Sequence, residues 1–131
     1  MTANRFINPD TIAPPRGYTH VVETTGPGRT IYISGQLGLD PSGKMGADFR
    51  AQATQAFENL KAALAAVGAD FSHVVKITTF FTDMADLPTF FEVRNAYVNT
   101  KAPPASTAVA ISKLARDGAL FEIEAIAVVP G

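Results

Sequence analysis

One segment, between Asp48 and Gly68, has the periodicity of an amphipathic helix, and segments of strand character lie on both sides of it. Its apolar residues recur every three or four positions: Phe49, Ala53, Ala56, Phe57, Leu60, Leu64 and Val67. Asp48 is a suitable N-cap because its carboxylate can accept from a free amide of the first turn, and Gly68 suits a left-handed residue after the helix. The polar residues, among them Gln52, are assigned to the opposite side of the helix. A long helix set between strands predicts an α+β fold.

Five further segments are rich in β-branched and aromatic residues and are predicted to be strands. They are residues 18–24, 30–34, 74–82, 106–112 and 120–129. The Gly-Pro-Gly turn at residues 26–28 predicts that the first two form a β-hairpin. A second helix is predicted from about residue 86 to residue 99, with Pro88 in its first turn. The predicted order of elements is therefore β-β-α-β-α-β-β.

This order predicts a two-layer sandwich in which both helices pack on one face of a mixed sheet. The 131 residues suffice for one domain, with a core over about residues 18–129, and are too few for two. The second face of the sheet would carry every other residue of each strand, many of them apolar, without a covering layer. Because a monomer rarely exposes a large contiguous apolar patch, we expect a closed homo-oligomer that covers this face.

The sequence excludes several kinds of chemical site. Cysteine is absent, so disulfides, thiolate nucleophiles and sulfur-bound metals are excluded. His20 and His73 are the only histidines, and neither has a second ligand at the spacing of a zinc site. The glycine-rich loop at residues 35–44 lacks the G-x-x-x-x-G-K-[ST] pattern of a phosphate-binding loop. We therefore expect neither a metal nor a nucleotide in this protein.

Charge and hydropathy limit the partners that the chain could have. The net charge is −1 and the basic residues are scattered, unlike the clustered basic surface that binds phosphates. Residues 1–10 are polar and contain no apolar signal segment, and no stretch approaches the roughly eighteen apolar residues of a membrane span. We expect no nucleic-acid partner, no membrane association and a cytoplasmic location.

Two glutamates interrupt the apolar sequence of the closing strand. Strand alternation places Glu122 and Glu124 on one face together with Ile126. One interpretation is that both carboxylates are solvated at a strand end. The other is that one of them lies in a partly dry pocket at a subunit interface, where burial would raise its pKa toward the range useful for proton transfer.

Three more residues admit both a functional and a structural interpretation. Ser34 ends the second predicted strand, where its hydroxyl can bind a ligand or bond to the local backbone. No G-x-S-x-G sequence surrounds Ser34, so a nucleophilic role is not expected. Tyr18 opens the first predicted strand beside Gly17. Phe91, which follows Phe90, is most simply explained by packing in the core or at an interface.

Four stretches of the sequence together resemble the RidA/YjgF family. They are YISGQLGL at 32–39, QATQAFENLKAAL at 52–64, VVKITTFFTDM at 74–84 and EIEAIAV at 122–128. The order and lengths of the segments also match from about Tyr18 to Val129. The resemblance implies a chorismate-mutase-like α+β fold assembled as a homotrimer with three clefts between subunits. The best-known members hydrolyse reactive enamines and imines, such as 2-aminoacrylate, to a 2-keto acid and ammonia without a cofactor.

The resemblance extends to some residues of the family's cleft and fails at two others. Tyr18 matches the family's tyrosine, Ser34 matches the serine of S-G-Q, and Glu122 matches the first glutamate of E-I-E-A-I-A. Ala105 stands where the family's P-A-R-S/C-T-like motif has the arginine that pairs with the substrate carboxylate. Phe91 stands where the family has an asparagine in the second helix.

The replacement at position 105 bears directly on the expected activity. Ala105 offers no donor, whereas a guanidinium binds a carboxylate through two charge-assisted hydrogen bonds. Four basic residues could compensate if the fold brought one of them to the cleft: Arg16, Arg94, Lys113 and Arg116. Without such a residue we expect weak or absent 2-aminoacrylate deaminase activity. Phe91 makes the expected cleft more apolar and favours a less charged, aromatic or aliphatic, ligand.

Two hypotheses of function follow from the residues and the resemblance. The first is a cofactor-free hydrolase or deaminase that acts on a C=N or C–N bond of a small imine, enamine or amide-like metabolite. Glu122 would position a water or move a proton. The ligand would be oriented by Tyr18, Ser34 and groups at Ala105, Ser106 and Thr107. The alternative is a trimeric module that binds a metabolite or a protein without turning it over. Endoribonuclease activity, also attached to the family, is disfavoured by the near-neutral charge.

Overall fold

The computed structural model describes residues 3–131, which form six strands and two helices joined by loops and two short 3₁₀ turns. The elements are β1 (Ala3–Ile7), β2 (Val21–Thr25), β3 (Gly28–Leu37), α1 (Phe49–Ala65), β4 (Val74–Phe81), α2 (Leu87–Arg94), β5 (Ala105–Ala110) and β6 (Phe121–Pro130). The 3₁₀ turns are Phe71–His73, before β4, and Met84–Asp86, before α2.

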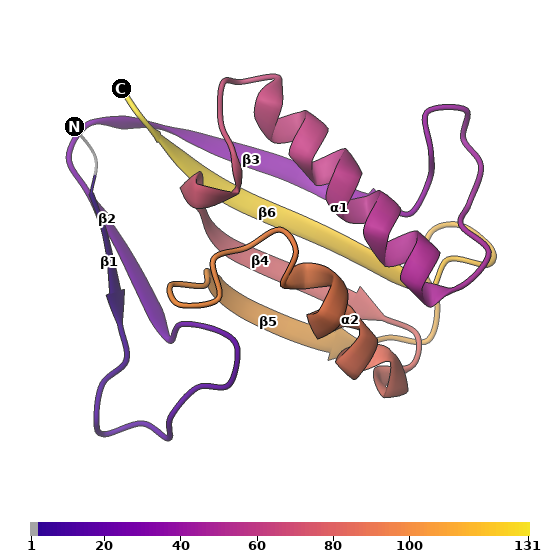
Figure 1. The fold of residues 1–131 in the computed structure, drawn as a ribbon, viewed down its shortest axis with the longest axis horizontal. Helices are drawn as coiled ribbons and strands as arrows, with labels where there is room; N and C mark the ends of the chain where they lie inside the picture. The colour runs from indigo at the N-terminus through magenta and orange to yellow at the C-terminus, as the bar shows by residue number, and fades with distance from the viewer. Residues whose placement is uncertain (1–2) are drawn as a thin grey trace.

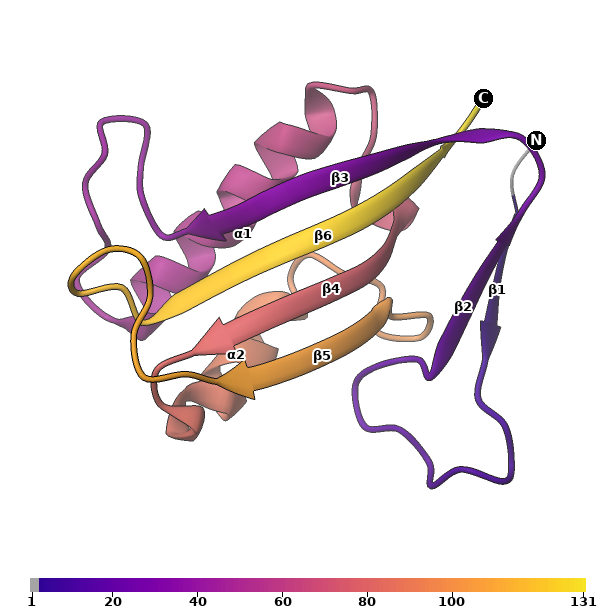
Figure 2. The same cartoon turned by 180° about the vertical axis from the view of Figure 1, so that it is seen from behind.

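Four strands form the main sheet, in the order β3-β6-β4-β5. β6 pairs antiparallel with β3 on one side and with β4 on the other, and β5 pairs parallel with β4. Both helices lie on one face of this sheet (Figure 1), and the same strands seen from behind have no helix over them (Figure 2). The predicted α+β sandwich, with two helices on one face of a mixed sheet, is therefore confirmed. We call the side without helices the open face.

The predicted hairpin between the first two strands is wrong. β2 pairs with β1, a strand that the polar N-terminal sequence did not predict, whereas β3 pairs with β6. The ribbon of β1 and β2 stands away from the end of the sheet (Figure 1). It is held by an ion pair of 2.6 Å between Arg5 and Glu23 and by a bond of 2.8 Å from Thr24 to Asn4. β3 and β6 each have ten residues, so their ladder is longer than any that the five-residue β2 could form with β3.

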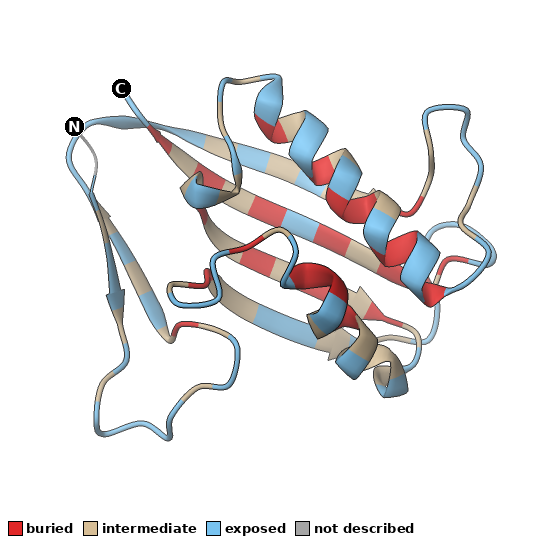
Figure 3. Ribbon diagram, in the orientation of Figure 1, coloured by how far each residue is buried: buried red, intermediate tan, exposed pale blue. Residues whose placement is uncertain are grey.

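The core lies between the sheet and the helices and is densest around phenylalanine rings. Along β6, alternate residues from Phe121 to Val129 are buried and those between them are half-buried or exposed, as the alternation predicted (Figure 3). The ring centroid of Phe121 lies 5.4–6.4 Å from those of Phe57, Phe81 and Phe90. Rings at such distances attract one another by about 0.5–1.5 kcal/mol per pair beyond their burial. This cluster joins α1, α2, β4 and β6 into one core.

Helix α1 begins at the predicted N-cap, but one residue that the sequence assigned to its polar side is buried. The Asp48 carboxylate accepts from the Ala51 amide at 2.8 Å, and Gly68, three residues after the helix ends, has a left-handed φ of +74°. Gln52, assigned from the sequence to the polar side, is buried, with an exposed fraction of 2%. Its amide group donates to the carbonyls of Gly46 and Gly118, and its oxygen accepts from the Leu120 amide. The buried glutamine thus ties two loops to the helix.

The last elements are shorter than the sequence indicated. α2 ends at Arg94 rather than near residue 99, because the amides of Ala96 and Tyr97 bond to carbonyls three residues back and tighten the chain into a turn. β5 spans Ala105–Ala110 rather than residues 106–112. Within residues 3–131, neither helix is long and apolar enough to cross a lipid bilayer.

We predict that Gln52→Leu lowers the free energy of unfolding by about 2–4 kcal/mol, because it removes three hydrogen bonds between a buried side chain and the backbone of two loops. Equilibrium denaturation with urea at a single protein concentration measures this change. Gln55→Leu is the matched control, since within residues 3–131 the Gln55 side chain bonds to Asn59 of the same helix and to no loop, and a change below about 0.5 kcal/mol is expected there. Equal losses in the two variants would contradict the role given to Gln52.

Candidate functional site

The predicted site residues lie on opposite faces of the main sheet. Residues paired across adjacent strands point to the same face. Ser106 of β5 pairs with Ile77 of β4, which is buried under the helices. Glu122 of β6 pairs with Phe80, and Phe80 alternates with the buried Phe81, so Glu122 points to the open face. Within one chain, the sheet therefore separates Ser106 from Glu122.

One group of predicted site residues lines a pocket beneath α2, at the edge of the sheet formed by β5; it consists of Tyr18, Phe91 and Ser106. This pocket, which we call the α2 pocket, has a volume of about 350 Å³. Its walls are formed by Arg16, Gly17, Tyr18, Leu87, Phe90, Phe91, Ser106 and Ala108. Tyr18, Phe91 and Ser106 are thus brought together although they lie far apart in the sequence. The walls are mostly apolar, with two hydroxyls and one guanidinium, which is the composition expected for a small-molecule site.

The loop before β2 places Tyr18 at this pocket. The sequence predicted that Tyr18 opens a strand, but β2 begins three residues later, at Val21. Gly17 has a left-handed φ of +79°, which a residue with a side chain adopts only with strain. Thr19, which is buried, donates through its hydroxyl to the Pro103 carbonyl at 2.5 Å and through its amide to the Pro104 carbonyl at 3.3 Å. The loop is therefore fastened next to the start of β5.

Arg94 of α2 is buried beside the α2 pocket, with an exposed fraction of 4%. Its guanidinium lies over the Phe91 ring, 4.9 Å from the centroid, and donates to the Gly17 carbonyl. It also donates twice to the Asn95 side chain. Burial lowers the pKa of Arg94 from its ordinary value. These contacts fix Phe91 and the Tyr18 loop relative to each other, so that Arg94 maintains the shape of the pocket.

Glu122 lies on the open face against Gly35 of β3. A Cβ atom added at Gly35 would lie 1.8 Å from the Glu122 Oε2, so a side chain at residue 35 would force this carboxylate to move. The pairing of β3 with β6 is irregular between Ile33 and Gln36, and this irregularity includes Gly35. Burial, and then the negative charge of Glu124, raise the pKa of the half-buried Glu122. The direction of this shift is the one that the sequence interpretation expected for a carboxyl in a partly dry setting.

Ser34 and Glu124 lie farther along the open face. Both line a shallow hollow of about 250 Å³, together with the exposed ring of Tyr32. The Ser34 carbonyl, rather than its hydroxyl, accepts from the Gln36 side chain at 3.0 Å. Glu124 is exposed, which agrees with the solvated interpretation for this one of the two glutamates.

The side chains of residues 105–107 in β5 alternate between the two faces of the sheet. Ala105 pairs with Lys76 and Thr107 pairs with Thr78 on the open face, whereas Ser106 faces the α2 pocket. Lys76 donates from its Nζ to the Thr107 hydroxyl at 2.8 Å. Ala105 and Thr107 therefore do not lie together with Ser106, although all three were predicted to serve one ligand.

Sequence reasoning missed Gly35, Lys76 and the structural role of Arg94. The glycine of the S-G-Q sequence gave a signal, since a glycine inside a strand often marks a close approach by another group. No sequence pattern pointed to Lys76, because its neighbours depend on the pairing of β4 with β5. Arg94 had been considered only as a substitute for the arginine at position 105.

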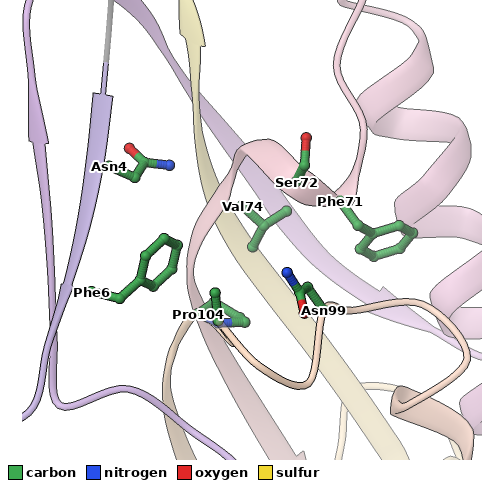
Figure 4. Close-up of a pocket in the computed structure, with 8 residues that line it drawn as sticks. Asn4, Phe6, Phe71, Ser72, Val74, Asn99 and Pro104 are labelled. Atoms are coloured by element: carbon green, nitrogen blue, oxygen red, sulfur yellow. The ribbon is translucent and has the colours of Figure 1, made fainter.

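A separate pocket of about 180 Å³ lies between the N-terminal ribbon and the body of the protein (Figure 4). Phe6 reaches it from β1, Val74 from β4, and Asn99 and Pro104 from the connection between α2 and β5. None of the predicted site residues lines it. The α2 pocket and the open face around Glu122 therefore remain the candidate site.

The sequence is similar to a family model described as Endoribonuclease L-PSP, which matches residues 9–129. It is 48% identical over 103 residues to protein DfrA of Myxococcus xanthus, covering 77% of each chain. It is 45% identical over 102 residues to the 2-iminobutanoate/2-iminopropanoate deaminase of Mus musculus, covering 76% of this chain and 74% of that one. Among solved structures, YyfB of Yersinia pestis, a protein of the conserved Rid family, superposes with a TM-score of 0.83 at 32% identity, covering 96% of this chain and 98% of that one.

We predict that Glu122→Gln is more stable than the wild type at neutral pH and that this advantage disappears on acidification. A carboxyl whose folded pKa lies above the ordinary value of 4.5 binds a proton more tightly in the folded state. The stability of the wild type therefore falls as pH rises through the interval between 4.5 and the raised value. Urea denaturation from about pH 3.5 to pH 7 compares the two proteins. A constant difference across this range would contradict the raised pKa.

Proposed function

Because the chain belongs to the RidA/YjgF family, we propose that it binds and hydrolyses a small imine or enamine in a cleft between two copies of the chain. One observation supports this proposal above the others: Glu122 and the α2 pocket lie on opposite faces of one sheet. A ligand in the α2 pocket cannot reach the Glu122 of its own chain through the sheet. A second copy that lies with its open face toward the pocket would supply the missing carboxylate.

Glu122 is the group that we propose to move the protons. Its carboxylate takes a proton from a water whose oxygen adds to the carbon of the C=N bond, and the nitrogen receives a proton to become an amine. Glu122 then takes the proton of the hydroxyl and delivers it to the amine nitrogen, so that the C–N bond breaks, ammonia leaves with the bonding electron pair, and a carbonyl is formed. The net reaction consumes one imine and one water, yields one ketone group and one ammonia, and requires no cofactor. A pKa raised toward neutrality suits a group that accepts and returns a proton.

The α2 pocket would hold the body of the ligand. The hydroxyls of Tyr18 and Ser106 can donate to a polar substituent, while Phe91 and Leu87 offer apolar contact. Ser34 and Thr107 lie on the open face, as Glu122 does. We propose that these two groups bind the same ligand from the partner's side.

We propose a homotrimer, in agreement with the uncovered sheet. The open face carries Tyr32, which is 77% exposed, and the partly buried Ile126 paired with it. Apolar groups of this kind on a sheet without helices favour burial against another copy. Three identical copies arranged in a ring would give three equivalent clefts.

The first prediction for this function concerns turnover. We expect the wild type to accelerate the hydrolysis of 2-iminobutanoate, generated in situ from 2-aminobutanoate by an amino-acid oxidase and followed through the 2-oxobutanoate and ammonia released. Glu122→Gln should lower the enzymatic rate by about 10²- to 10⁴-fold, the usual effect of losing a general acid–base. The matched control is Glu92→Gln, since Glu92 is exposed and paired with Arg50 away from both faces of the site.

Two outcomes would contradict the hydrolytic proposal. The first is an unchanged rate in Glu122→Gln. The second is a wild type that binds the imine but releases it unaltered. This second outcome would support the alternative of a non-enzymatic trimeric binding module, which the alanine at position 105 favours.

The second prediction concerns the two-copy cleft. Ala108→Trp fills the α2 pocket, whereas Glu122→Gln removes the proton-transfer group, so that each variant alone should be inactive. When the two are co-expressed with different tags and purified as mixed trimers, about a third of the clefts, one in each trimer, should combine an intact pocket with an intact Glu122. Recovery of activity to that level supports a cleft between copies. Mixed oligomers without activity, or a monomer by light scattering, would contradict it.

A further inference from the structure

The charged side chains at the α2 pocket are positive. Among its lining residues, Arg16 is charged and no residue is acidic. A second guanidinium, that of Arg94, lies directly beside the pocket, against Phe91 and Gly17. Two positive charges therefore lie around a cavity whose walls are otherwise apolar or carry neutral hydroxyls.

Neither guanidinium forms an ion pair within residues 3–131. The ion pairs formed within residues 3–131 join Arg5 to Glu23, Arg50 to Glu92, His73 to Asp70 and Lys113 to Asp117. Burying a cation without an anionic partner is costly, and Arg94 is nearly completely buried. An anion in the adjoining pocket would be attracted by both charges, and the attraction by the buried Arg94 would be less screened by water than that by an exposed charge.

The two arginines differ in what they can do for a ligand. Arg94 is committed to the Gly17 carbonyl and the Asn95 side chain, and it lies over the Phe91 ring. Arg16 is exposed on the loop at the mouth of the pocket, and no hydrogen bond of its side chain to another of residues 3–131 occupies it. Its forked donors are therefore available to a ligand, whereas those of Arg94 are largely used.

We propose that Arg16 is the residue that binds the carboxylate of a small anionic ligand in the α2 pocket, with Arg94 as the fixed positive charge behind it. The guanidinium of Arg16 matches a carboxylate in shape and can bind both of its oxygens. The hydroxyls of Tyr18 and Ser106 complete the polar end of the site, and Phe91 contacts the aliphatic part. This assignment deepens the proposed function and rests on its choice of the α2 pocket as the ligand site.

Arg16 lies on the other side of the sheet from position 105, so it reaches a ligand from a different direction than a side chain at that position would. Ala105 is directed to the open face, whereas its neighbour Ser106 faces the pocket to which Arg16 belongs. Lys76, the basic residue nearest to Ala105 in the sheet, is bonded to Thr107 on the open face. Of the four basic residues considered from the sequence, Arg16 lines the pocket and Arg94 adjoins it, while Lys113 is paired with Asp117. The ligand that fits is therefore an anion, in contrast to the less charged one that the sequence favoured.

The test compares a carboxylate with its uncharged amide. Isothermal titration of the full-length protein with 2-oxobutanoate and with 2-oxobutanamide should show tighter binding of the carboxylate by at least about 10-fold. Arg16→Gln should weaken binding of the carboxylate by about 10- to 100-fold and leave the amide nearly unchanged. Arg16→Lys should retain part of the preference for the carboxylate over the amide, because lysine keeps the positive charge but lacks the paired N–H donors of the guanidinium. Arg116→Gln, which removes an exposed arginine outside the pocket, is the matched control and should bind as the wild type does.

The outcomes separate this assignment from the hydrolytic proposal. Equal carboxylate affinity in Arg16→Gln and the wild type, or a wild type that does not prefer the carboxylate, would overturn the role of Arg16. If the wild type hydrolyses 2-iminobutanoate and Arg16→Gln keeps the same KM, the hydrolytic proposal stands and the assignment fails. If the wild type binds 2-oxobutanoate through Arg16 but does not hydrolyse the imine, the assignment stands and hydrolysis fails.

Discussion

The pairing of β6 on both of its edges is the constraint on which the rest of the structure depends. β3 and β4 both take their register from β6, so its alternation decides the face of every residue in the centre of the sheet. A slip by one residue would turn Glu122 into the phenylalanine cluster and expose Phe121. The apolar packing around Phe121 therefore determines where the polar groups of the open face lie.

The environment of Glu122 is a consequence of this register. The carboxylate lies where a side chain at residue 35 would otherwise stand, and Gly35 is the residue that permits it. Partial burial against β3 and repulsion from Glu124 both favour the protonated form. The group proposed to transfer protons thus owes its environment to a glycine, an irregular ladder and a like charge.

The α2 pocket depends on contacts between segments that are distant in the sequence. The loop at Tyr18 is fastened to the start of β5 by Thr19, and Arg94 joins this loop to Phe91. The same contacts place Arg16 at the pocket. A positive charge therefore reaches the α2 pocket from a loop near the N-terminus.

The sequence alone was sufficient for the two helices, the four strands of the main sheet, the α+β class and the alternation of β6, because each depends on a local period and on nearby caps such as Asp48. It also singled out Tyr18, Ser34, Phe91 and Glu122. It could not predict that β2 leaves β3 to pair with β1, or that Gln52 is buried between two loops, since strand partners and loop contacts are chosen by competition across the whole chain. For the same reason only the tertiary structure decided which candidates share a pocket. Adjacent residues of a strand point to opposite faces, so Ser106 and Thr107 are separated by the sheet, while Arg16 and Phe91, 75 positions apart, lie at one pocket.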